Sequence, residues 1–128
     1  MTSQRRLLQL CIAIGGIVPV AAGLAGIVLG PDMFGGHESI LSVSHFRYLS
    51  GLLLAIGLAY WSTIPWIERA GARFRLLTFI VFVGGMSRLF GVLVGDPLNG
   101  ATLFALCMEL GVTPALYWWQ SRVARLSV

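Results

Sequence analysis

The sequence predicts an all-α integral membrane protein, an antiparallel four-helix bundle that runs up-down-up-down with both termini cytoplasmic. Charged residues make up only 11% of the 128 residues, less than half of the roughly 25% typical of soluble domains. Four apolar segments reach about the 20 residues that a membrane-spanning helix needs. Seven of the nine arginines also fall on one side of these segments.

Turn-forming residues separate the four predicted helices, which run from about 7 to 29, 44 to 66, 74 to 94 and 101 to 119. Gly30-Pro31-Asp32 ends the first helix and Gly95-Asp96-Pro97 ends the third, because proline resists continuing a helix and glycine favours a turn. The first apolar run exceeds the roughly 7–15 residues of a signal-peptide core. We therefore expect it to be retained in one transmembrane domain spanning residues 1–128.

The arginines predict the orientation of the helices, because cytoplasmic loops carry an excess of basic residues. The loops at 30–43 and 95–100 hold no arginine, the chain has no lysine, and Asp32, Glu38 and Asp96 lie in these loops. The opposite side holds Arg5, Arg6, Arg69, Arg73, Arg75, Arg122 and Arg125. Both termini are thus expected in the cytoplasm. The four tryptophans, Trp61, Trp66, Trp118 and Trp119, lie near the same ends and fit an interfacial aromatic belt.

Small residues recur at helical spacing and predict close helix packing. The first helix has Gly15, Pro19, Gly23, Gly26 and Gly30 on one stripe, without a polar group. The stripes of the other three helices include charged or polar residues, which makes them candidates for a site as well as for packing.

Arg88 and Glu109 are charged residues inside the third and fourth predicted helices. Each lies about seven or eight residues from the outer end of its helix, or roughly 10–12 Å at 1.5 Å per residue. An unpaired charge at this depth costs from about 2.5 to more than 10 kcal/mol. Because the two helices are consecutive and antiparallel, we expect an Arg88–Glu109 ion pair.

The start of the second helix carries His45, Arg47 and Tyr48 on the same outer side. With Arg88 and Glu109 they predict a polar pocket open to the outside, with Asp96 and His37 near its mouth. Two arginines against one glutamate favour an anionic guest, such as a lipid phosphate, a fatty-acid carboxylate or a quinone-like head. The alternatives are a purely structural Arg88–Glu109 clamp and a path for protons or ions.

Other kinds of site find little support in the sequence. His37 and Glu38 have no third ligand at a suitable spacing, so no metal site is expected. No catalytic triad, phosphate loop or nucleotide fingerprint is present, so no cofactor or catalytic residue is predicted. The arginines do not form an aromatic-interleaved patch of the kind that binds nucleic acid. Cys11 and Cys107 are expected as free, buried thiols.

Three short motifs resemble a family of small four-helix bacterial membrane proteins, known as domain of unknown function 4345. They are Phe46-Arg47-Tyr48-Leu49-Ser50-Gly51, Gly84-Gly85-Met86-Ser87-Arg88 and Glu109-Leu110-Gly111. The resemblance implies a bacterial inner-membrane protein with four spans and supplies no reaction.

The sequence leaves several functions open. A non-enzymatic protein that binds a membrane lipid or another anionic amphiphile is the leading hypothesis. A structural or accessory subunit of a larger membrane complex is the second, with a homo-oligomer or a membrane protein as partner. A membrane enzyme or redox accessory similar to DoxX-like proteins is the third.

Overall fold

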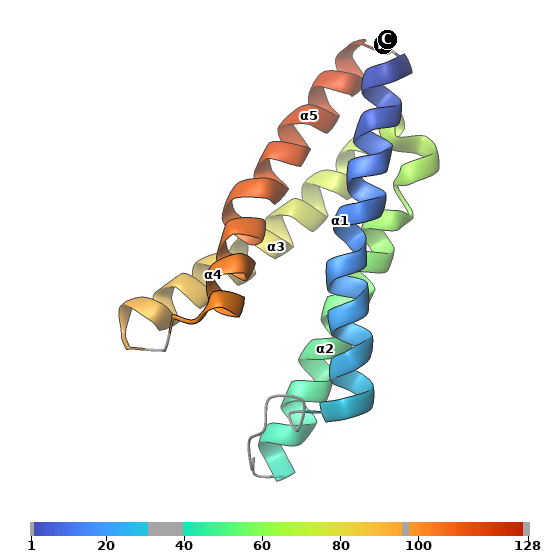
Figure 1. Cartoon of the computed structure of the whole chain (residues 1–128). Helices are drawn as coiled ribbons and strands as arrows, with labels where there is room; N and C mark the ends of the chain where they lie inside the picture. Colours follow the sequence, from blue (N-terminus) through green and yellow to red (C-terminus); the bar gives the residue numbers. More distant parts are fainter. Residues whose placement is uncertain (1, 31–39, 96–97, 127–128) are drawn as a thin grey trace. The chain divides into compact units, whose positions relative to one another are not determined.

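The computed structural model describes residues 2–30, 40–95 and 98–126, and the regular elements within these ranges are all helical. They are α1 (Thr2–Leu29), α2 (Ile40–Trp61), the 3-10 helix η2 (Ile64–Arg69), α3 (Gly71–Leu93), α4 (Gly100–Cys107), the π-helix η3 (Met108–Val112) and α5 (Thr113–Leu126) (Figure 1). The last three elements follow one another without a break. The all-α prediction is therefore confirmed.

Three helical segments are long and apolar enough to cross a membrane: Ser3–Leu29, Gly71–Leu93 and Gly100–Leu126. Many of their large apolar side chains are uncovered by protein; Val28 is 72% exposed and Leu93 is 76% exposed. Such surfaces suit lipid better than water. These helices indicate a membrane protein.

The second predicted span falls on the helix of residues 40–61. Its helix, α2, has 22 residues but is not among the three segments that meet the length and hydropathy requirements in the described residues. Its apolar run follows a stretch that contains Ser44, His45 and Arg47.

The predicted end of the second helix at Trp66 is wrong, because α2 ends at Trp61. Pro65 has no N–H to donate to the carbonyl of Trp61, and its ring would clash with that carbonyl in an α-helix. The hydroxyls of Ser62 and Thr63 instead donate to the carbonyls of Ala59 and Tyr60, at 2.5 and 2.6 Å. Trp66 lies in η2 with a non-helical backbone, at φ −123° and ψ 38°.

The other ends also differ from the apolar runs. The helix α1 begins at Thr2 and α3 begins at Gly71, because both continue into the polar residues beside the membrane. The last helix runs to Leu126, beyond the predicted end at 119, and carries Arg122 and Arg125 on its final turns.

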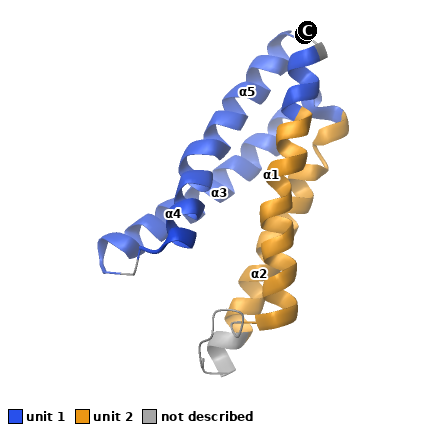
Figure 2. Cartoon of the chain, viewed as in Figure 1, with its two compact units in different colours: residues 1–8, 66–128 blue, residues 9–65 orange. Residues whose placement is uncertain are grey.

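The chain forms two compact units, which Figure 2 shows in different colours. Unit 2 comprises residues 9–65 and contains most of α1 together with α2. A Cβ built on Gly57 would lie 2.7 Å from Val20, and one on Gly23 would lie 2.7 Å from the Leu54 nitrogen. Later residues of α1 thus contact earlier residues of α2, so the two helices are antiparallel.

Only part of the predicted glycine stripe makes this packing. Gly23 and Gly26 face α2, where a Cβ would overlap Ser50, whereas Gly15 has open space beside it. Its neighbour Gly16 takes that role, because a Cβ there would overlap the Trp61 ring. The face of α1 that packs on α2 therefore includes Gly16 in place of Gly15, because Gly16 leaves room for the Trp61 ring.

Unit 1 comprises residues 1–8 and 66–128 and pairs α3 with the continuous helix of α4, η3 and α5. Gly71 lies beside Gln120, and Gly85 lies beside Glu109 and Leu110, so this pair is also antiparallel. The apolar side chains buried in this unit are Leu8, Ile67, Phe74, Leu77 and Val123.

Candidate functional site

Arg88 of α3 and Glu109 of η3 form the predicted ion pair. The Arg88 Nε donates to Glu109 Oε2 at 3.2 Å, and Nη2 donates to Oε1 at 3.0 Å. Two parallel hydrogen bonds make this a fork-to-fork pair, the geometry in which arginine holds a carboxylate most firmly. The structure therefore confirms the contact that matched depth predicted.

Gly85 brings the two helices close enough for this pair. It lies three residues before Arg88, nearly one helical turn away on the same side of α3. A Cβ at Gly85 would lie 2.8 Å from the Glu109 Cβ and 2.8 Å from Leu110 Cδ2, which is tighter than side chains tolerate. The absence of a side chain at Gly85 thus sets the spacing beneath the ion pair.

Glu109 lies in the π-helix η3, a single widened turn within the last helix. Pro114 explains why the turn widens here, because in an α-helix its ring would clash with the carbonyl of Leu110. The Met108 carbonyl accepts instead from the Thr113 N–H, and from the Thr113 hydroxyl at 2.7 Å. Widened turns of this kind occur frequently at functional sites.

The two partners differ in how far the protein covers them. The Arg88 side chain is 44% exposed and the Glu109 side chain is 19% exposed. The guanidinium has five N–H donors, and the pair uses two of them on the Nε–Nη2 edge. The Nη1–Nη2 edge remains for a further acceptor.

Arg47 of unit 2 has a role that the sequence did not predict. Its Nε donates to the Ile27 carbonyl at 3.1 Å, one of the carbonyls in the last turn of α1 that lack an intrahelical partner. The guanidinium lies against Gly30, which has a φ of +65° and ends α1; a Cβ there would lie 3.1 Å from Nη2. Arg47 thus caps α1.

The remaining predicted site residues lie as follows. His45 and Tyr48 are exposed on the first turns of α2 in unit 2, and Tyr48 is 66% exposed. Asp96 and His37 lie outside the described residues. Within unit 1 the structure brings together Arg88 and Glu109; within unit 2 it places Arg47 on the end of α1.

A polar cluster at the arginine-rich end of unit 1 escaped the sequence analysis. Gln120 is 1% exposed and donates to the Ile67 carbonyl at 2.8 Å. Trp119 donates from Nε1 to Gln4 Oε1 at 3.0 Å. Gln120, which directly follows the apolar and aromatic residues 115–119, is the sequence signal that could have found this contact.

Arg5 and Glu68 form a second ion pair in this cluster, at 2.8 Å. The hydrogen bond from Arg5 is the main cause that lowers the pKa of Glu68 below its ordinary value of 4.5. A backbone hydrogen bond and the positive charges of Arg5 and Arg69 act in the same direction, against a smaller effect of burial.

The tryptophans divide into two kinds. Trp66 and Trp118 are 62% and 59% exposed and fit the predicted aromatic belt. Trp61 instead donates from Nε1 to the Ala13 carbonyl at 3.1 Å, and Trp119 bonds to Gln4. These two rings hold helices together.

Cys11 and Cys107 are free thiols in the structure. Cys11 is half-buried, whereas Cys107 is exposed, so the prediction of a buried thiol is wrong for Cys107. Among the described residues, no three metal-binding side chains come together.

Comparison with known proteins gives one match. The family model described as Domain of unknown function (DUF4345) covers residues 7–120, which confirms the family resemblance predicted from the sequence. The matched range contains the Arg88–Glu109 pair, Gly85 and Arg47. No curated protein and no solved structure matches the chain.

Proposed function

The chain belongs to the family described as Domain of unknown function (DUF4345), and on that premise we propose that it binds an anionic amphiphile at Arg88. In this proposal the chain is a bacterial inner-membrane protein with four spans and cytoplasmic termini. In that topology Arg88 and Glu109 lie in the outer half of the membrane, and the site opens outward.

The half-exposed Arg88 guanidinium is the observation that carries this proposal. Glu109 holds the Nε–Nη2 edge in a fork, which fixes the plane of the group and directs its other edge away from the carboxylate. An N–H group without an acceptor is costly in hydrocarbon. The second edge has the geometry to bind a phosphate or carboxylate through two further hydrogen bonds.

The position of Arg88 along α3 favours an amphiphile over a freely soluble anion. Five residues separate Arg88 from Leu93 at the end of α3, or roughly 8 Å along the axis. An arginine at this depth reaches the headgroup level while its stem stays among apolar groups. The polar head of the guest then meets Arg88, and its apolar part lies in the hydrocarbon.

Native mass spectrometry of protein extracted in mild detergent tests the proposal. The informative variant is Arg88→Met, Glu109→Gln, because it removes the pair without leaving either charge alone. We expect it to retain one anionic amphiphile fewer than the wild type. Arg125→Met, at an exposed arginine of α5, is the control and should retain the wild-type complement. An unchanged complement in the double variant rejects the proposal.

The second candidate is a structural clamp in an accessory subunit, and the close packing at Gly85 favours it. In that case the fork serves only to fix α3 against η3. The double variant would then retain every bound lipid and would co-purify with the same partner chain as the wild type.

A further inference from the structure

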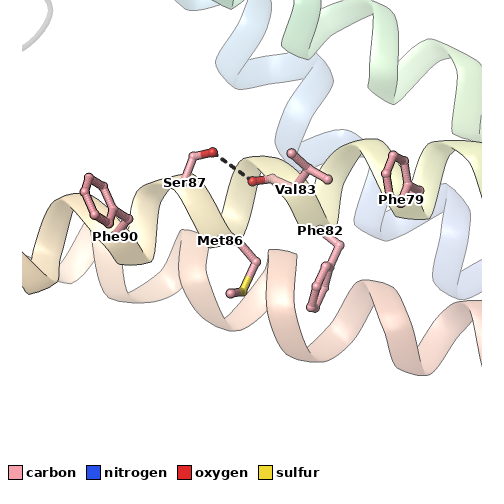
Figure 3. A pocket seen from close by; sticks show the side chains of 6 residues that line it. All are labelled: Phe79, Phe82, Val83, Met86, Ser87 and Phe90. Atoms are coloured by element: carbon pink, nitrogen blue, oxygen red, sulfur yellow. Dashed lines mark hydrogen bonds between the residues drawn. The ribbon is translucent and has the colours of Figure 1, made fainter.

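One face of α3 carries an open apolar groove (Figure 3). Its lining residues all come from α3: Phe79, Phe82, Val83, Met86, Ser87 and Phe90. Arg88 lies two residues after Met86, or roughly 200° around the helix. The groove is therefore separate from the ion pair.

The groove is a continuous apolar surface that protein leaves uncovered. Phe79 is 64% exposed and Phe90 is 67% exposed, with Phe82, Val83 and Met86 between 40 and 47%. Phe79 and Phe90 are 11 residues apart, or roughly 16 Å. That length equals about half of the roughly 30 Å hydrocarbon core of a bilayer, the depth that one acyl chain spans.

The polar group in the groove is satisfied within α3. The Ser87 hydroxyl donates to the Val83 carbonyl at 3.0 Å, as Figure 3 shows. It presents no unpaired donor to a guest, so the surface suits a hydrocarbon chain and offers nothing to a polar peptide.

Arg75 lies at the arginine-rich end of this same face. The residues Phe79, Phe82, Val83, Met86 and Phe90 follow it by 4, 7, 8, 11 and 15 positions, the spacing that keeps side chains on one face of a helix. Arg75 is exposed and stands one turn before the groove begins. A cationic group thus heads an apolar track, and Met86 in this track lies roughly 16 Å from Arg75, which is about the depth of one leaflet.

From this arrangement we infer that the groove binds one acyl chain of an anionic phospholipid, with the lipid phosphate held by Arg75. A phosphate complements the charge of Arg75 and accepts two hydrogen bonds from its planar guanidinium. The chain fills the part of the groove nearest to Arg75, from Phe79 to Met86. The phosphate site at Arg75 lies near the opposite end of α3 from Arg88, and the groove lies on the opposite face of the helix, so this inference does not depend on the function proposed above.

Photo-cross-linking in vesicles of phosphatidylcholine tests the inference. The probes are phosphatidylglycerol and phosphatidylcholine that carry the same diazirine midway along one acyl chain. Trypsin cleaves after Arg75 and Arg88 and releases residues 76–88, which contain most of the groove. We expect the phosphatidylglycerol probe to label this peptide about fivefold more than the matched probe, the factor for one arginine near a headgroup.

Two variants separate a site from diffuse attraction to a basic surface. Arg75→Gln should abolish the preference for phosphatidylglycerol, measured on the peptide that then begins at Phe74. Arg125→Gln changes the net charge equally and should keep the preference. Equal labelling by both probes in the wild type, or equal loss in both variants, overturns the inference. The preference should also survive Arg88→Met, Glu109→Gln, measured on residues 76–122, which trypsin releases once Arg88 is replaced. The Arg75 site and the Arg88 site can therefore be tested separately.

Discussion

Arg88 and Glu109 each carry a charge on helices that are otherwise apolar, and each depends on the other for compensation. Removing one partner of such a pair leaves an uncompensated charge, whereas replacing both is often close to neutral. We expect Arg88→Met or Glu109→Gln alone to lower the free energy of unfolding by roughly 3 kcal/mol. Denaturant unfolding in detergent measures this difference.

The double variant Arg88→Met, Glu109→Gln is the control for this prediction. It should recover most of the lost stability, because no charge then remains alone. A double variant as unstable as the sum of the two single variants would show that the fork itself contributes little.

Glu68 gives the chain a pH-dependent contribution to stability. Its pKa is lowered in the folded protein, mainly by the hydrogen bond from Arg5, so the folded state favours the ionised carboxylate. The contribution is complete above the ordinary value of 4.5 and is lost as the pH falls through the lowered pKa. Because both side chains are partly exposed, we expect only about 0.5 kcal/mol.

The measurement compares wild type with Glu68→Gln by thermal unfolding between neutral and acidic pH. The wild type should be more stable at neutral pH, and the difference should vanish in acid. A difference that stays constant with pH would contradict the assignment.

Single residues show where sequence reasoning succeeds. The Arg88–Glu109 pair could be predicted from the sequence, because the position of each residue along its helix gives its depth and a lone charge at that depth is costly. The Arg47 cap could not, because it depends on where the Ile27 carbonyl meets the side of α2. Gln120 likewise found its acceptor in η2, a segment whose 3-10 geometry had not been predicted.

At the scale of elements, Gly85 controls the approach of α3 to η3. Gly85→Ala should lower the melting temperature and lengthen or break the ion pair, because the new Cβ would lie 2.8 Å from Glu109 and Leu110. Gly84→Ala is a matched control with nothing within 4 Å of the new Cβ. It should be neutral or stabilising by up to about 1 kcal/mol.

Thermal unfolding of both variants decides this point. Equal effects of Gly84→Ala and Gly85→Ala would show that helix propensity dominates and that the contact at Gly85 is loose.

The elements that the sequence misplaced are those that proline reshapes. Pro65 ends α2 at Trp61, and Pro114 accompanies the π-helix around Glu109. By hydropathy alone, both stretches resemble continuations of apolar helices. Whether a proline ends, kinks or widens a helix also depends on which side chains bind the nearby carbonyls; here Thr63 donates to Tyr60 and Thr113 donates to Met108.

At the scale of the whole molecule, the number of spans fixes the sides of the two termini. Three described segments are long and apolar enough to cross a membrane, and the proposed topology adds α2 as the fourth. Four spans place both termini on one side, whereas three would place them on opposite sides.

Reporter fusions at each terminus test the four-span topology. With seven arginines on the terminal side, we expect both termini in the cytoplasm, so a cytoplasmic fluorescent reporter should be active at either end. A periplasmic reporter active at one terminus would show that α2 does not cross.

The central claim is that Arg88, held by Glu109, binds an anionic headgroup. An experimental structure of the protein in a lipid bilayer tests it most directly, through the density beside the Nη1–Nη2 edge of Arg88. We predict a phosphate- or carboxylate-shaped density within hydrogen-bond distance of that edge, continuing into an apolar tail. An Arg88 whose second edge is closed off by protein, with no density beside it, would contradict the claim.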